Sequence, residues 1–221
     1  MDYELEDINI LYEDKAMVVV VKPCGMASQP DPSGNKDMLT LLNSKYHDVF
    51  LVHRLDTATG GVMVYARGKQ AAGVLSNEVQ DHECFRKTYL VVLDKKPELD
   101  EGELVDYLYH DKRQNKSFVV KSDRKGSKEA KLIYKVLATN ENGNALVEVR
   151  LLTGRSHQIR VQFASRRTPV YGDGKYGSRC KMKGFALWSY KSSIKHPFTK
   201  KTLECVCEPD YTSMPWSSFK K

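Results

Sequence analysis

The amino-acid sequence predicts a mixed α+β domain dominated by a largely antiparallel sheet. Strand-like segments outnumber helix-like ones, and they do not alternate with helices as strictly as a parallel α/β fold requires. The chain has 221 residues, 41% hydrophobic and 29% charged, which is typical of a globular protein. No repeat, low-complexity tract or long linker divides it, so we expect a single domain over residues 1–221.

The first half is expected to begin with two strands, Ile8–Tyr12 and Met17–Lys22, which are short apolar runs joined by a turn. A loop rich in Pro, Gly and Ser follows them. The remaining elements of this half are a helix at Met38–Lys45, a strand at Val62–Arg67, a helix at Lys69–Gln80 and a strand at Arg86–Leu93.

The second half is expected to contain more strands and one helix. We expect Ser156 to cap a helix from His157 to Ser165, because Ile159 and Phe163 are four residues apart on an apolar face. The expected strands are Glu103–Tyr109, Ser117–Val120, Lys131–Ala138, Ala145–Leu152, Gly184–Ile194 and Lys201–Val206.

Composition excludes several classes of protein. No apolar run approaches the roughly 18 residues of a membrane span, and the acidic N-terminus does not resemble a secretion signal. Five scattered cysteines, an odd number, favour free thiols, so we expect a cytoplasmic protein without membrane contact. No second Cys/His pair of usable spacing accompanies Cys205 and Cys207, so we expect no metal site.

The formal net charge of +7 suggests a polyanionic partner. Two segments concentrate the cations. They are Lys112, Arg113, Lys116, Lys121, Arg124, Lys125, Lys128 and Lys131, and then Arg166, Arg167, Arg179, Lys181 and Lys183. Each group is either a solvated surface or a phosphate-tracking groove, and charge alone favours neither.

Two polar segments have the residue types of a functional site. HRLDTATGG covers residues 53–61, and LLTGRSHQIR covers residues 151–160. Taken separately, the first is also consistent with a turn in which Asp56 and Thr59 bind backbone donors. The second is also consistent with a capped, solvated helix start, although arginine is not favoured at the positive end of a helix dipole.

Together these segments resemble the RluA family of RNA pseudouridine synthases. HRLDTATGG resembles the family's HRLDxxTSG signature, LLTGRSHQIRVQFA its TGRTHQIRVH segment, and PVYGDGKYG its PIxGDxxYG segment. Similarity at VVVVKPCGM, FRKTYLVVL and IKHPFTKKTLE keeps the family's order, so the resemblance extends from about Ile8 to Glu208.

The resemblance implies a fold, a reaction and a partner. The fold would be the pseudouridine synthase α+β domain, a long mixed, mostly antiparallel sheet with flanking helices and a central active-site cleft. The reaction would isomerise uridine to pseudouridine in tRNA or rRNA, without a cofactor or a metal. Many relatives carry an N-terminal RNA-binding module of the S4 type; we expect none here, and a monomer.

The resemblance also implies roles for individual residues. Asp56 is expected to be the catalytic carboxylate beside the anomeric carbon, as nucleophile or as base. Arg160 is expected to keep that carboxylate ionised in a dry pocket, since a fixed guanidinium favours the charged form. Tyr89 would lie against the target base and act in proton transfer, and Leu187 would line the pocket.

Other residues are expected to handle the RNA. A uridine in folded RNA must leave the stack to reach a catalytic carboxylate, at a cost of a few kcal/mol. Arg54 is the family's candidate for filling the vacated space. His53 is placed with it, although a structural role is the favoured interpretation of this residue. Arg155, His157 and Gln158 complete the expected RNA contacts.

The sequence departs from the family at three positions. Gly60 stands where the family usually has Ser, Thr57 where a basic residue is common, and Trp188 where His is common. None coincides with Asp56, Tyr89 or Arg160, so the departures concern the target site rather than the chemistry.

Two alternatives belong to other functional classes. One is an RNA-binding or assembly factor that has lost catalysis, which a substitution at Asp56, Tyr89 or Arg160 would indicate; all three are present. The other is a carboxylate-dependent glycosidase for free nucleosides, which would be active without RNA and which the basic charge weakly disfavours.

Overall fold

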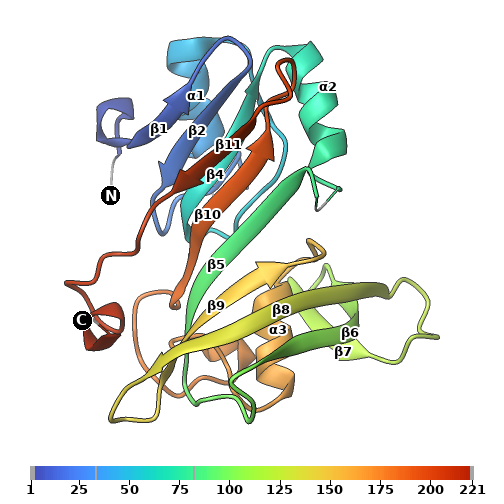
Figure 1. Cartoon of the computed structure of the whole chain (residues 1–221), viewed down its shortest axis with the longest axis vertical. Helices are drawn as coiled ribbons and strands as arrows, with labels where there is room; N and C mark the ends of the chain where they lie inside the picture. The colour runs from blue at the N-terminus through green and yellow to red at the C-terminus, as the bar shows by residue number, and fades with distance from the viewer. Residues whose placement is uncertain (1–2, 33, 82, 220–221) are drawn as a thin grey trace. The chain divides into compact units, whose positions relative to one another are not determined.

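The computed structural model describes residues 3–32, 34–81 and 83–219. The chain groups into two compact units (Figure 1). Unit 1 comprises the chain up to Lys87 together with Trp188–Glu208. Unit 2 comprises Thr88–Leu187 and the chain from Pro209. The boundaries fall inside two strands, β5 (Phe85–Leu93) and β10 (Leu187–Lys195).

Unit 1 is built on strands ordered β1-β2-β4-β10, with β3 paired to β4 and β11 to β10. The β1, β2, β3 and β4 pairs are antiparallel, as is β10 with β11, whereas β10 runs parallel to β4. The elements are η1 (Leu5–Asp7), β1 (Ile10–Glu13), β2 (Met17–Lys22), α1 (Met38–Tyr46), β3 (Val49–Leu51), β4 (Gly60–Arg67), α2 (Lys69–Glu78) and β11 (Thr202–Val206).

The core of unit 1 forms because β2 and β4 are apolar along nearly their whole length. Met17 and Val19 of β2 face Val64 of β4 and pack with Leu75 of α2 and Phe85. Residues that are buried on both faces of a strand read as continuous hydrophobic runs rather than as alternating patterns. The run MVVVVK ends at the buried Lys22, whose side chain contacts the turn that carries Asp56.

Unit 2 has strands ordered β5-β9-β8-β6-β7, and the pairs β8·β9, β6·β8 and β6·β7 are antiparallel. Helix α3 lies against β6 and β7, where Val161 packs with Leu108, Ala130 and Tyr176 (Figure 1). The elements are β6 (Glu101–Asp111), β7 (Lys116–Val120), β8 (Lys128–Thr139), β9 (Ala145–Leu151), α3 (Gln158–Ser165), η2 (Gly174–Tyr176) and η3 (Trp216–Phe219).

The α+β class is confirmed, with eleven strands in a mixed, mainly antiparallel sheet and three α-helices among the described residues. The expected elements are present with shifted ends; the strand expected from Gly184 begins at Leu187, and β3 was not expected. The Ser156 cap was wrong. His157 is the N-cap residue, in the left-handed region at φ 54°, with no side-chain cap bond. The Ser156 carbonyl instead accepts a hydrogen bond from Ser117 Oγ.

Candidate active site

The turn that carries Asp56 is anchored on both sides through its backbone. Ser28 Oγ accepts a hydrogen bond from Leu55 N–H at 3.1 Å and donates to Leu55 O at 3.0 Å. The Thr57 carbonyl accepts from Gly25 N–H at 2.8 Å, and the Asp56 carbonyl accepts from Thr59 N–H at 2.9 Å. Ser28 and Gly25 therefore hold the residues before and after Asp56, and this half-buried carboxylate is preorganised.

The buried side chain of Lys22 also holds this turn in place. Its fully buried ammonium donates to Met26 O at 2.6 Å, Pro23 O at 2.9 Å and Thr57 O at 3.3 Å. Burial lowers the pKa of Lys22 to about 8, whereas electrostatic interactions with Cys24 and Asp56 act in the opposite direction. A buried ammonium group thus links the end of β2 to the Asp56 turn.

His53 and Arg54, adjacent in sequence, have opposite environments. The His53 ring is buried, its Nε2 accepts from Val64 N–H at 3.0 Å, and it packs edge-on against Phe85. Burial, followed by the charge of Lys87, holds the pKa of His53 well below its usual range. Arg54 is exposed, as an RNA contact requires. We therefore assign His53 to the structure and leave Arg54 as the RNA-contact prediction.

Two departures from the family pattern lie against each other in unit 1. Trp188 is paired with Gly60 across β10 and β4, and a Cβ on Gly60 would lie 2.5 Å from the Trp188 ring and 2.7 Å from Cys24 Sγ. The neighbouring Gly61 has φ 110° and faces the Ser189 backbone so closely that it admits no side chain. The indole donates from Nε1 to Cys207 O at 2.7 Å, so Trp188 fills space beside the Asp56 turn.

In unit 2, Arg160 is clamped by an acid from another family segment. Arg160 Nε donates to Asp173 Oδ2 at 2.6 Å and a terminal nitrogen donates to Asp173 Oδ1 at 3.0 Å, and both residues are buried. The guanidinium also lies 4.2 Å from the Phe185 ring centre and 4.9 Å from that of Tyr176. A bidentate, ring-flanked arginine has one orientation, which suits a fixed charge in a site.

The residues before Arg160 are tied to neighbouring strands. Gln158 Oε1 accepts from Arg155 N–H at 3.0 Å and from Thr153 Oγ1 at 2.7 Å, while its amide donates to Lys131 O at 3.0 Å. Thus Gln158 is buried and closes the turn rather than facing solvent. Arg155 is exposed, with Nε donating to Glu129 O at 2.8 Å, and His157 Nδ1 lies 2.9 Å from the Tyr176 hydroxyl.

Tyr89 and Leu187 are buried residues of unit 2, at 6% exposure each. The structure thus brings Arg160 together with His157, Asp173 and Tyr176 in unit 2, and the Asp56 turn together with Lys22 and Ser28 in unit 1. Asp56 belongs to unit 1, and its proximity to Tyr89, Arg160 and Leu187 stays a prediction.

The sequence interpretation missed three supporting residues, Lys22, Ser28 and Asp173. Each was visible only indirectly. Lys22 and Asp173 lie in segments shared with the family, and a charged residue beside a buried strand or opposite a buried arginine needs a partner. Ser28 lies in a loop with several Ser, Pro and Gly residues, and nothing in the sequence distinguishes it from its neighbours.

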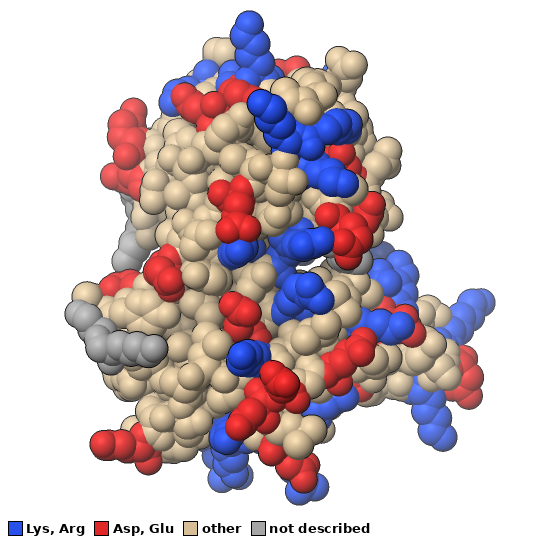
Figure 2. Space-filling view, in the orientation of Figure 1, with Lys and Arg blue, Asp and Glu red and all other residues tan. Residues whose placement is uncertain are grey.

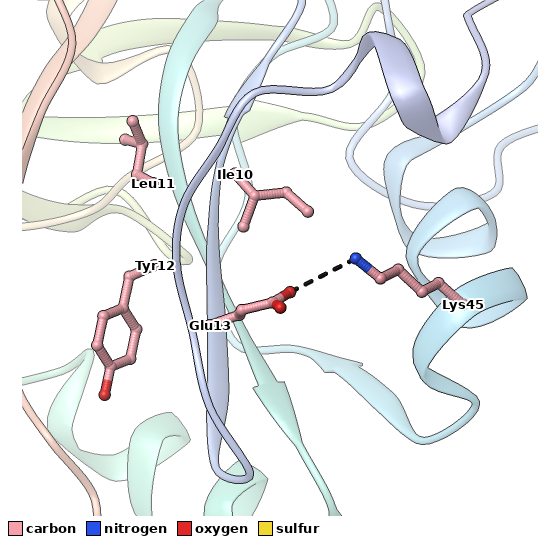
Figure 3. A pocket seen from close by; sticks show the side chains of 5 residues that line it. All are labelled: Ile10, Leu11, Tyr12, Glu13 and Lys45. Atoms are coloured by element: carbon pink, nitrogen blue, oxygen red, sulfur yellow. Dashed lines mark ion pairs between the residues drawn. The ribbon is translucent and has the colours of Figure 1, made fainter.

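A shallow pocket lies elsewhere on unit 1. Its volume is about 350 Å³, and it is lined by β1 residues and by Lys45 of α1. Figure 3 shows Lys45 facing Glu13, with which it forms an ion pair at 3.6 Å. None of the predicted site residues lines this pocket, so we do not assign the active site to it.

No helix among the described residues is long and apolar enough to cross a membrane.

Comparison with known proteins defines the class. The fold matches that of human RNA pseudouridylate synthase domain containing 1 with a TM-score of 0.80 at 22% identity, covering 98% of this chain and 89% of that chain. Residues 16–165 match the family model described as RNA pseudouridylate synthase.

Sequence relatives agree with this match. The chain is 30% identical over 207 residues to the dual-specificity RNA pseudouridine synthase RluA of Yersinia pestis, covering 91% of this chain and 99% of that protein. It is 32% identical over 205 residues to the uncharacterized RNA pseudouridine synthase YhcT of Bacillus subtilis, covering 89% and 67%. It spans 56% of the length of relatives from Aquifex aeolicus and Rickettsia bellii. The chain therefore belongs to the RNA pseudouridine synthase family, whose members are isomerases.

Proposed function

We propose that the protein converts specific uridines of tRNA or rRNA to pseudouridine, using Asp56, Tyr89 and Arg160 in one catalytic domain and no cofactor. The observation that carries the proposal is the anchoring of the Asp56 turn by Ser28 and Lys22. The turn that bears this carboxylate makes five hydrogen bonds through the backbone of Leu55, Asp56 and Thr57, so it has little freedom to relax, and fixed geometry is what an attack on an anomeric carbon needs.

The chemistry balances without an added reagent. The N1–C1′ bond of uridine breaks with assistance from the Asp56 carboxylate, which attacks C1′ or removes a proton from the sugar. The uracil rotates and C5 bonds to C1′. The C5 proton is then lost and N1 gains one, so product and substrate are isomers. Tyr89 is assigned to support the base and carry a proton.

Arg160 is assigned to face Asp56 and favour its ionised form. Two of its five N–H donors go to Asp173. The clamp fixes the plane of the guanidinium. Exposed Arg54 is assigned to the space that the flipped uridine vacates.

The decisive test is Asp56→Asn, with exposed Asp48→Asn as a matched control in the same unit. The substrate is RNA labelled with tritium at C5 of uridine, prepared from cells that lack the gene, and release of the label reports formation of the new C5–C1′ bond. We expect Asp56→Asn to lose release by more than about 10³-fold while RNA binding persists. The control should keep it. Normal turnover by Asp56→Asn would overturn the mechanism.

The same assay separates the alternatives. If the wild-type protein binds RNA but releases no tritium and leaves every uridine unchanged, an RNA-binding factor without catalysis is the better description. If it cleaves or isomerises free uridine without RNA, a nucleoside enzyme is. Mapping pseudouridines in RNA from cells with and without the gene then identifies the modified position.

A further inference from the structure

One end of unit 2 carries most of the net charge of the chain. Residues 111–128, which we call the basic end, contain seven Lys or Arg and two Asp, a net charge of +5 against +7 for the whole chain. They form the end of β6, the β6–β7 turn, β7 and the β7–β8 loop. Figure 2 shows Lys and Arg side chains projecting at the right-hand edge, where Figure 1 shows the β7–β8 loop.

The cations of the basic end are not neutralised within the protein. Among the described residues, none of the seven forms an ion pair, although other lysines and arginines of the chain do. Asp111, one of the two acids, instead accepts bonds from the Arg113 and Gln114 N–H groups and from the Gln114 amide. The resulting positive field is available to an external anion.

Aromatic side chains accompany this charge on one face of the sheet. Tyr109 is directly opposite Phe118 in the β6·β7 register, so both project from the same face, away from Leu108 and α3. The Arg124 guanidinium lies 4.0 Å from the Tyr109 ring centre, and Lys116 Nζ lies 5.7 Å from that of Phe118. Half-buried rings flanked by cations on a sheet are typical of surfaces that stack nucleic-acid bases.

The basic end is joined directly to a segment expected to contact RNA. Ser117 Oγ of β7 donates to the Ser156 carbonyl at 2.6 Å. Arg155 Nε donates to the carbonyl of Glu129, which is paired with Tyr107 across β6 and β8. The basic end and the exposed Arg155 are therefore held next to each other within unit 2, although Ser117 itself is buried on the face opposite Phe118.

We propose that the basic end, together with the neighbouring Tyr109, binds a single-stranded segment of the substrate RNA, outside the target nucleotide. Bases would stack on Tyr109 and Phe118, and the lysines and arginines of the basic end would hold the phosphates. The proposal rests on the proposed function for the identity of the substrate. It commits to single-stranded RNA because the bases of an A-form duplex are stacked on each other and closed to aromatic rings.

Charge is tested with Lys121→Gln/Arg124→Gln/Lys125→Gln, all exposed in the β7–β8 loop. The matched control is Lys15→Gln/Lys69→Gln/Lys201→Gln, three exposed lysines of unit 1 with the same total charge change. Binding of a fluorescein-labelled 20-residue oligouridine is measured by anisotropy at several salt concentrations, in the Asp56→Asn background. In the loop variant, we expect the slope of log affinity against log salt concentration to be smaller than in the wild type by about 2, which is what three phosphate contacts contribute. The control variant should keep the wild-type slope.

Stacking is tested with Phe118→Leu, which keeps an apolar residue on the strand, and exposed Phe198→Leu of unit 1 is the control. Loss of one stacked base corresponds to a fall of about 5- to 150-fold in oligouridine affinity. Thermal melting shows whether each variant is folded, and a labelled 20-base-pair duplex should bind more weakly than the single strand.

Equal losses in the loop variant and the charge control, or tighter binding of the duplex, would overturn the proposal. So would unchanged oligouridine affinity in both Phe118→Leu and the loop variant while the wild-type protein still forms pseudouridine. If instead the wild-type protein forms no pseudouridine, the proposed function fails, and the binding measurements still decide whether the basic end binds RNA.

Discussion

Gly60 and Trp188 are complementary, because the indole ring occupies the space where a side chain on Gly60 would lie. A Cβ at Gly60 would be 2.5 Å from the ring, a distance that no relaxed structure tolerates. Both residues differ from what is common in the family, so the two departures form one packing solution rather than two independent changes.

Gly60→Ser alone should therefore destabilise the protein. Overpacking of this kind costs typically about 1–3 kcal/mol of unfolding free energy. Trp188→His in the same chain should recover part of that loss, because the smaller ring vacates its space while Cys24 Sγ, 2.7 Å from the same Cβ, stays in place. Urea unfolding of the two single variants and the double variant gives the coupling free energy. Strictly additive effects would show that the two residues are not coupled.

Asp173→Asn should be strongly destabilising, because it leaves the buried Arg160 guanidinium without its carboxylate. Breaking a buried pair on one side costs about 3–5 kcal/mol. Asp100→Asn removes an ion pair with Lys96 that is exposed, and should change stability by less than about 1 kcal/mol. The two variants are compared by urea unfolding at pH 7. Similar small losses in both would contradict the structural role of the clamp.

Ser28→Ala should lower both stability and turnover. It removes the hydroxyl that serves both backbone groups of Leu55, and an unsatisfied buried group costs about 1–3 kcal/mol. Because Asp56 follows directly, a small displacement of the turn should reduce kcat about 10-fold or more with little change in KM. Ser44→Ala, which removes one bond on the surface of α1, is the control. Wild-type kcat in Ser28→Ala would show that the anchor does not position Asp56.

Lys87→Met should stabilise the protein at neutral pH. Burial lowers the pKa of Lys87 to about 8, and among the described residues its ammonium meets the Phe85 ring, at 5.0 Å, rather than a carboxylate. The unfolded lysine keeps its proton up to about pH 10.4. Below pH 8 both states are protonated and the folded state bears the full penalty, of up to about 3 kcal/mol.

The stability difference between Lys87→Met and wild type should accordingly shrink as pH rises from about 8 to 10.5, since the folded lysine is then already neutral. Urea unfolding at pH 7, 8, 9 and 10 measures it, with exposed Lys69→Met as the control that shows no such trend. A constant difference across this range would contradict the lowered pKa.

The positions of the elements followed from the sequence because apolar runs and turn residues are local signals. Met17–Lys22 was predicted with its observed ends, since five apolar residues bounded by Lys22-Pro23 leave little choice. The cap at Ser156 failed because the tertiary bond from Ser117 and the left-handed conformation of His157 replaced a local rule with a long-range contact.

The same contrast between local sequence signals and long-range contacts applies to the candidate site. Resemblance located Asp56, Tyr89 and Arg160, but the supports of these residues were not predictable. Ser28 meets Leu55 across 27 residues of sequence, and Lys22 meets Thr57 across 35. Such partners are set by how strands pair, and no periodicity or spacing within either segment encodes them.

Ser28 and Lys22 anchor the Asp56 turn through main-chain atoms only, the amide and carbonyl of Leu55 and the carbonyl of Thr57. Side chains at Arg54, Thr57 and Ala58 can therefore be exchanged without disturbing what holds the carboxylate. Under the proposed function, a library randomised at Thr57 and Ala58 should change which RNA is modified while Asp56 keeps its position, whereas Arg54 is needed for the flipped uridine. Within this one turn, the side chains that can be exchanged are thus separate from the backbone groups that hold Asp56 in place.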